Sequence, residues 1–69
     1  MANVVWFRLA GRDLTRYLLY EKGRVRIWIP INGNTLSLEV FEEGVGFISI
    51  AEKRVTEYEI IGEKMKVVL

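Results

Sequence analysis

The chain has 69 residues, a formal net charge of +1, and neither cysteine nor histidine. The missing cysteines exclude a disulfide framework and a thiolate zinc site, and the missing histidines remove the commonest general base and metal ligand. A chain of this length forms one small domain, expected to span residues 1–69. It buries only about 60% of its extended surface, so a dense core or oligomerisation must stabilise it.

The composition also bears on the source and the location of the protein. Glutamine is absent too, and Arg, Lys and Glu supply most of the charge, as in thermophile proteins; chance in a short chain is the alternative. No apolar run reaches the roughly 20 residues of a membrane span, and the first residues lack the basic region and cleavage site of a signal peptide. We therefore expect a cytoplasmic (intracellular) protein, from a thermophile, that does not enter a membrane.

Residues 4–9 alternate in the manner of a β-strand. Val5, Phe7 and Leu9 share one face of this strand, and Trp6 and Arg8 share the other. Residues 10–13 are expected to form a turn, because they contain Gly and Asp.

Residues 13–22 are compatible with two structures. Asp13 suits the start of a helix and Gly23 its end, and residues between them recur at helical spacing. Against this, Tyr20-Glu-Lys-Gly-Arg24 matches Phe41-Glu-Glu-Gly-Val45 at an offset of 21 residues, and both stretches suit a three-residue hairpin loop. We favour a strand with Tyr20 opposite Arg24 and Tyr17 opposite Ile27, and keep one short helix packed on the sheet as the alternative.

The clearest hairpin runs from Arg24 to Phe41. Asn32-Gly33 lies between two alternating apolar runs and tolerates the positive φ angles of a type I′ turn. This turn sets Val25 opposite Val40 and Ile27 opposite Leu38 on an aliphatic face. The other face then carries Trp28 opposite Ser37, Arg26 opposite Glu39 as an ion pair, and Arg24 opposite Phe41.

Two further hairpins are expected after Phe41. The first sets Val40 opposite Gly46 and Leu38 opposite Ile48, with a bend or bulge at Gly46. Residues 52–54 are interpreted as a polar loop, which sets Ala51 opposite Val55 and pairs this strand with the next. A Gly62-Glu63 turn then sets Ile60 opposite Met65, Tyr58 opposite Val67 and Glu59 opposite Lys66.

The predicted fold is all-β, a small antiparallel meander of about seven strands. A sheet with one apolar face must cover it, so the meander curls into a barrel or compact sandwich, or packs against a second copy. We favour the barrel or sandwich. An odd number of strands leaves the first and last strands parallel to each other or as open edges. The predicted apolar face comprises Val5, Phe7, Leu9, Tyr17, Leu19, Val25, Ile27, Ile29, Leu36, Leu38, Val40, Ile48, Ile50, Tyr58, Ile60, Met65, Val67 and Leu69.

Catalysis has weak support in the sequence. Glu42-Glu43 and the Glu57/Glu59 pair are carboxylate pairs, but both are expected in solvent, where acid and base roles are not separated by burial. No nucleophile motif or phosphate-binding loop is present. We therefore expect a protein that is not an enzyme and that holds no metal or cofactor.

A basic and aromatic face is the first candidate site. The register above places Trp6, Arg8, Arg16, Tyr20, Arg24, Arg26 and Trp28 on the outward side of the first three strands. Arginine engages phosphates, and aromatic rings stack on unpaired bases at about 1–3 kcal/mol each. The same residues also stabilise sheets by cross-strand pairing, or form protein interfaces.

A second, apolar patch is expected on the outer face of the second half. Its residues are Phe41, Val45, Phe47 and Ile61, and such a patch indicates an oligomer contact or a partner site; cover by Arg24 and nearby glutamates is the alternative. Two functions follow. The first is a nucleic-acid-binding protein whose partner is DNA or RNA, and the second is a homo-oligomeric or protein-interaction module whose partner is itself or another protein.

Overall fold

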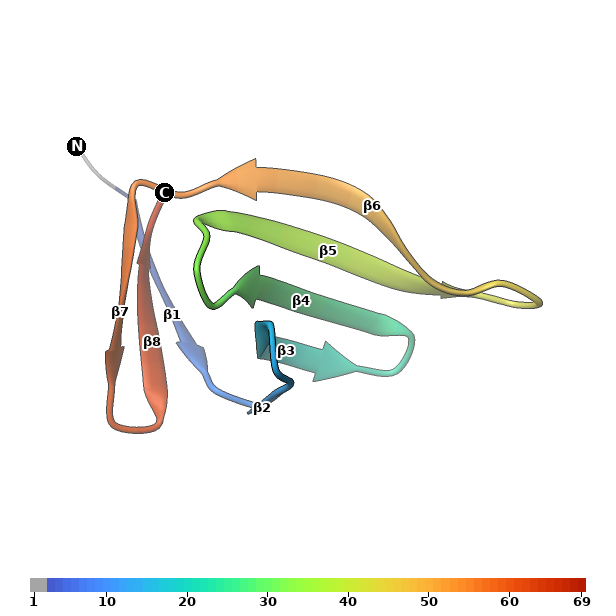
Figure 1. The fold of residues 1–69 in the computed structure, drawn as a ribbon, viewed down its shortest axis with the longest axis horizontal. Helices are drawn as coiled ribbons and strands as arrows, with labels where there is room; N and C mark the ends of the chain where they lie inside the picture. The colour runs from blue at the N-terminus through green and yellow to red at the C-terminus, as the bar shows by residue number, and fades with distance from the viewer. Residues whose placement is uncertain (1–2) are drawn as a thin grey trace.

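A computed structural model describes residues 3–69, which form eight strands and no helix (Figure 1). The all-β prediction is therefore confirmed, and residues 16–22 form a strand and not the alternative helix. No helix with the length and hydrophobicity of a membrane crossing occurs among the described residues. The strands are β1 (Val4–Arg8), β2 (Gly11–Arg12), β3 (Arg16–Lys22), β4 (Val25–Pro30), β5 (Thr35–Glu42), β6 (Gly46–Arg54), β7 (Glu57–Ile61) and β8 (Lys64–Val68).

The strands form two antiparallel sheets that pack as a compact sandwich. One sheet has the order β1-β8-β7, and the other has the order β2-β3-β4-β5-β6. Figure 1 shows the three-stranded sheet standing at a steep angle across one end of the five-stranded sheet. At the other end of the five-stranded sheet, the hairpin of β5 and β6 extends past the turn between β3 and β4 (Figure 1).

The chain passes between the sheets at two points, and backbone hydrogen bonds continue through both. After β1, Leu9 N donates to Glu63 O (2.9 Å) and Ala10 N donates to Leu18 O (2.8 Å). After β6, Val55 N donates to Asn34 O (2.7 Å) and Thr56 N donates to Val68 O (2.8 Å). Each crossing therefore leaves one sheet and enters the other without losing its backbone partners.

The core lies between the two sheets. Its buried members are Leu19, Ile29, Val55, Met65 and Val67. All except Val55 belong to the predicted apolar face, since alternation along a strand assigns side chains to faces. The alternation of residues does not assign Val55 to this face, because Val55 lies at the second crossing, directly after the polar residues 52–54. The residues that pack around this cluster are Phe7, Leu9, Tyr17, Ile27, Leu36, Tyr58 and Leu69.

Two predicted registers are confirmed. Val25 pairs with Val40, Ile27 with Leu38 and Trp28 with Ser37 between β4 and β5. Between β7 and β8, Ile60 pairs with Met65, Tyr58 with Val67 and Glu59 with Lys66. Both are local hairpins, in which the alternation of apolar residues specifies the pairing.

The predicted meander fits the fold, but its strand pairing differs at two places. The chain leaves the five-stranded sheet after Arg54, so β6 does not pair with β7, and residues 52–54 belong to β6 instead of a loop. The expected turn after β1 contains the short strand β2, which pairs with β3. With this extra strand, β1 runs antiparallel to β8, and the difficulty of an odd strand number disappears.

Two further registers are also corrected. The β3–β4 loop has two residues, with Gly23 at φ 59°, so Lys22 pairs with Val25 and a bulge at Leu19 brings Tyr17 opposite Ile29. In β5–β6, Val40 pairs with Ile48, and the bulge falls at Ile50. A bulge adds one residue to one strand and shifts the pairing beyond it, and alternation alone does not locate it.

The loop around Asn32-Gly33 is not the expected type I′ turn. Neither residue has positive φ, and Gly33 N donates to Pro30 O (3.3 Å). Contacts from elsewhere hold the loop: Ile31 N donates to Thr15 O (2.9 Å), and the Tyr58 hydroxyl donates to Ile31 O (2.7 Å). Tertiary hydrogen bonds therefore override the local preference of Asn-Gly.

Candidate functional site

The outer face of the five-stranded sheet carries four of the seven residues predicted to bind nucleic acid. Arg16, Arg24, Arg26 and Trp28 lie on β3, β4 and the turn between them. Directly opposed residues of antiparallel strands share a face, so the pair Phe41–Phe47 of β5 and β6 adjoins them. We call this set of six residues the arginine–aromatic face.

Trp28 and Arg16 are held by Glu39 from β5. The Trp28 side chain is 8% exposed, and its Nε1 donates to Glu39 Oε1 (2.7 Å). The Arg16 guanidinium lies 3.8 Å from the centre of the Trp28 ring and donates to Glu39 Oε2 (3.1 Å). Asp13 accepts a second bond from Arg16 (3.4 Å). A nucleobase can stack on Trp28 only by displacing Arg16, so this ring is not available as the predicted stacking platform.

The other two arginines cover the phenylalanines. Arg26 lies 3.9 Å from the centre of the Phe47 ring and donates to Glu21 Oε2 (2.6 Å), while Arg24 lies 5.2 Å from Phe41. The expected ion pair of Arg26 with Glu39 does not form, although the two residues are opposite each other, because Glu39 accepts from Arg16 and Trp28. These contacts are cation–π pairs and ion pairs that stabilise the sheet.

The remaining three predicted nucleic-acid residues lie elsewhere. Trp6 and Arg8 are on β1 in the three-stranded sheet, where Trp6 is 52% exposed and Arg8 contacts Glu63 (3.7 Å) at the surface. Tyr20 follows the bulge and pairs with Ile27, so it lies on the inner face of the five-stranded sheet. The predicted seven-residue surface is therefore divided among three places.

The predicted apolar interface patch is also divided. Phe41 and Phe47 contact each other edge to face, with ring centres 5.5 Å apart, under the two arginines. Val45 lies in the β5–β6 loop and is 71% exposed, and Ile61 is on β7 in the other sheet. Cover by Arg24, the alternative from the sequence, describes Phe41 correctly.

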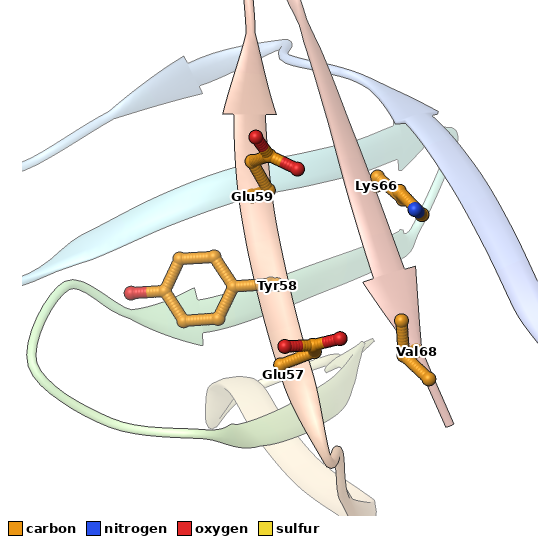
Figure 2. A pocket seen from close by; sticks show the side chains of 5 residues that line it. All are labelled: Glu57, Tyr58, Glu59, Lys66 and Val68. Carbon is orange, nitrogen blue, oxygen red and sulfur yellow. The ribbon is translucent and has the colours of Figure 1, made fainter.

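The carboxylates of β7 line a shallow hollow of about 250 Å³ with Tyr58, Lys66 and Val68 (Figure 2). Glu57 and Glu59 are both exposed, and Glu59 lies opposite Lys66. Burial, with a smaller effect of Tyr17, raises the pKa of Tyr58. Residues 3–69 bring no three potential metal-binding side chains together. The hollow therefore offers a solvated set of charges and no shielded acid–base pair.

The inner face of the five-stranded sheet contains a groove that the sequence did not indicate. Its volume is about 230 Å³, and its lining is almost wholly apolar. Beyond the groove, the same face continues over the row Val25, Val40 and Ile48, which are paired across β4, β5 and β6. We call Val25, Leu38, Val40 and Ile48 the open face, because the three-stranded sheet lies across the other end (Figure 1). The groove is lined by Ile27, Leu36, Leu38, Ala51, Glu52 and Lys53.

The groove and the open face meet a free sheet edge. β6 is nine residues long and ends the sheet, pairing only with β5 among the described strands. Its residues 48–54 are exposed, with Ile48 at 36% and Ile50 at 55%. The other three edges of the described sheets are shorter: β2 has two residues, β1 has five, and β7 has five with glutamates at positions 57 and 59. A long apolar edge is a template for pairing with another strand.

The backbone groups at this edge can be assigned from the ladder. Phe41 N donates to Arg24 O, directly before β4 (2.8 Å), so the backbone groups of Phe41 point toward β4. Phe41 and Phe47 are therefore a pair that exchanges no backbone hydrogen bonds. The backbone N–H and C=O groups of Phe47, and two residues later of Ser49, therefore point away from β5. The bulge at Ile50 interrupts this alternation, and regular pairing resumes from Ala51 to Arg54.

A signal for the free edge does exist in the sequence. Residues 52–54 contain none of the usual turn-forming residues Gly, Pro, Asn and Asp, which favours continuation of the strand. The charge of residues 52–54 favours a polar loop instead. A loop there would pair β6 with the next strand, so that β6 would lie inside the sheet and not at its edge.

Comparisons of the chain with protein-family models, with curated proteins and with solved structures find no match.

Proposed function

We propose that this chain is a non-enzymatic protein-interaction module that binds a partner by addition of a β-strand to β6. The observation that carries the proposal is the nine-residue free edge of β6 beside the open face. In this mode of recognition, main-chain hydrogen bonds supply affinity, and pockets beside the edge select side chains of the added strand.

The groove and the open face suit the second role. An added strand places alternate side chains over the inner face, next to Ala51 and Leu38. Full burial of one aliphatic side chain stabilises by about 1.5–3 kcal/mol, so covering Ile48 and Ile50 contributes a useful part of a binding free energy. The arginine–aromatic face on the other side is already occupied by its own contacts.

Panning of a random peptide library against the immobilised protein tests the proposal. We expect peptides with alternating apolar residues to be enriched, and to shift the amide resonances of Phe47 and Ser49. Ser49→Pro should abolish their binding, because proline removes an outward N–H while the ladder to β5 is kept. Ser49→Ala is the matched control, since it removes only the hydroxyl that contacts Ser37 (2.9 Å). Enriched peptides that bind both variants equally would contradict the proposal.

Nucleic-acid binding is a second candidate, at a smaller site than the sequence suggested. The observation that favours it is the half-exposed Trp6 ring on β1, with Lys66 opposite and Arg8 on the same face. Labelled single- and double-stranded oligonucleotides should then bind with steep salt dependence, and Trp6→Ala should weaken binding while Tyr20→Ala leaves it unchanged. Flat anisotropy curves at low salt would end this candidate.

A further inference from the structure

We infer that the strand added to β6 is β6 of a second copy of this chain, in antiparallel orientation about a two-fold axis at Ile48. This inference rests on the proposed function, and it names the partner. The dimer joins two five-stranded sheets edge to edge, and it brings the two open faces next to each other.

The backbone selects the position of the axis. The stretch from Phe47 to Ser49 presents alternating outward groups around the apolar Ile48. The regular pairing that resumes beyond the bulge at Ile50 surrounds Lys53 instead, and an axis there would set two ammonium groups opposite each other. An axis at Ile48 sets Phe47 of each copy opposite Ser49 of the other copy. Opposed residues that both point outward exchange two hydrogen bonds, so this register uses every outward group of the stretch from Phe47 to Ser49.

The charges select the antiparallel orientation. The hairpin tip before β6 carries Glu42 and Glu43, and the end of β6 carries Lys53 and Arg54. An antiparallel arrangement about Ile48 brings the acidic hairpin tip of each copy toward the basic end of β6 in the other copy. A parallel arrangement would instead place like charges side by side, which is unfavourable.

The apolar side chains agree with the same register. Ile48 lies on the inner face, opposite Val40, and it meets Ile48 of the second copy at the axis. The two residues form a non-hydrogen-bonded pair there, in which side chains approach most closely. The contact is isologous, so it closes at two copies and leaves no further edge of this kind.

A cysteine placed at the axis tests the register directly, because the natural chain contains no cysteine. Under mild oxidation, Ile48→Cys should form a disulfide-linked dimer nearly completely, since the Cα atoms of a non-hydrogen-bonded pair lie about 4.5 Å apart, within the range that a disulfide spans. Ile61→Cys is the matched control, because Ile61 is exposed to a similar degree (49%) on the other sheet. Equal cross-linking of the two variants would overturn the register.

Sedimentation measures the association itself. The wild type should show twice the monomer mass of 8.0 kDa at high concentration. Ile48→Lys should weaken the dimer at least about a hundredfold, because two ammonium groups then meet at the axis. Ile61→Lys should leave it unchanged. Circular dichroism verifies that both variants fold, and a folded Ile48→Lys variant with undiminished association would contradict the interface.

A charge exchange tests the orientation. Glu43→Lys and Lys53→Glu should each raise the dissociation constant about tenfold, because each change brings like charges toward each other at both ends of the symmetric interface. The double variant should restore the wild-type value. Additive losses in the double variant would overturn the antiparallel pairing of these ends.

The failures of the two proposals are distinguishable. A chain that stays monomeric at every concentration, yet binds library peptides at β6, overturns the dimer and retains the interaction module. A chain that neither associates nor binds peptides overturns both.

Discussion

The two halves of the inner face of the five-stranded sheet have the same chemistry and different surroundings. At one end, Leu19 and Ile29 are 2% and 0% exposed beneath the three-stranded sheet. At the other end, Ile48 and Ile50 are 36% and 55% exposed. Along this face β4 carries Val25, Ile27 and Ile29, and β5 carries Leu36, Leu38 and Val40. The chain therefore presents more apolar face than its own second sheet covers. Under the proposed function, an added strand covers the exposed half.

The largest effect expected from this comparison concerns the same substitution in the two halves. Ile29→Ala should lower the free energy of unfolding by about 2–5 kcal/mol, since it leaves a cavity in the covered core. Ile48→Ala should cost less than about 1 kcal/mol at concentrations where the chain is monomeric. Denaturant unfolding of both variants measures the difference, and equal losses would show that the two halves are equally covered.

The next prediction concerns the outer face of the five-stranded sheet, where the arginine and aromatic side chains are already paired with one another and with glutamates. Glu39→Ala removes the acceptor of both Trp28 and Arg16 and should lower the free energy of unfolding by about 1.5–3 kcal/mol. Tryptophan emission should shift to longer wavelength as Trp28 becomes exposed. Glu43→Ala, at the exposed hairpin tip, serves as the control for loss of one carboxylate. An unchanged emission spectrum in Glu39→Ala would contradict the conclusion that Glu39 holds Trp28 and Arg16 in place.

A smaller effect is expected where Tyr58 ties the two sheets at the covered end. Tyr58→Phe removes the hydrogen bond to Ile31 O and should cost about 1 kcal/mol. Tyr20→Phe, on an exposed ring, should cost nothing measurable.

The same tyrosine gives an alkaline signature. Burial raises the pKa of Tyr58, so the folded state favours the neutral phenol. This contribution to stability is full below the pKa of the unfolded phenol, about 10, and is lost as the pH rises through the raised folded value. The wild type should therefore lose more stability than Tyr58→Phe above that pH, and parallel unfolding curves for the two proteins would refute the assignment.

The smallest effect is expected at Asp13 in the turn before β3. The backbone N–H of Thr15 is the main cause that lowers the pKa of this carboxyl, with a bond to Asp13 Oδ1 of 2.8 Å. Its contribution is present above the unfolded pKa and lost as the pH falls through the folded value. Asp13→Asn keeps the accepting oxygen, so its unfolding free energy should fall less steeply in acid. An identical acid profile would contradict this role.

The sequence predicts the faces and the registers of strands that pair in local hairpins. Alternation places Val25, Ile27, Tyr58 and Met65 on the correct face and in the correct register, because a slip of one residue would expose them. The crossing at Val55 and the bulges at Leu19 and Ile50 are departures from regular pairing, so alternation does not reveal them. They also decide which edge remains free.

The candidate site shows the same division. The sequence identifies the arginines and aromatic residues of the outer face, but not their partners. The choice of Glu39 by Arg16 and Trp28 follows from the three-dimensional arrangement of β3, β4 and β5. The nucleic-acid and oligomer hypotheses therefore remain predictions, and the structure adds the free backbone edge of β6, which neither of them used.

Amide hydrogen exchange at Phe47 and Ser49 tests the central claim most directly. Their N–H groups point away from β5, and only an added strand can protect them. We expect slow exchange for both amides at high protein concentration and fast exchange on dilution, with the N–H of Ile48, which faces β5, protected throughout. Fast exchange of Phe47 and Ser49 at every concentration would contradict self-pairing through β6.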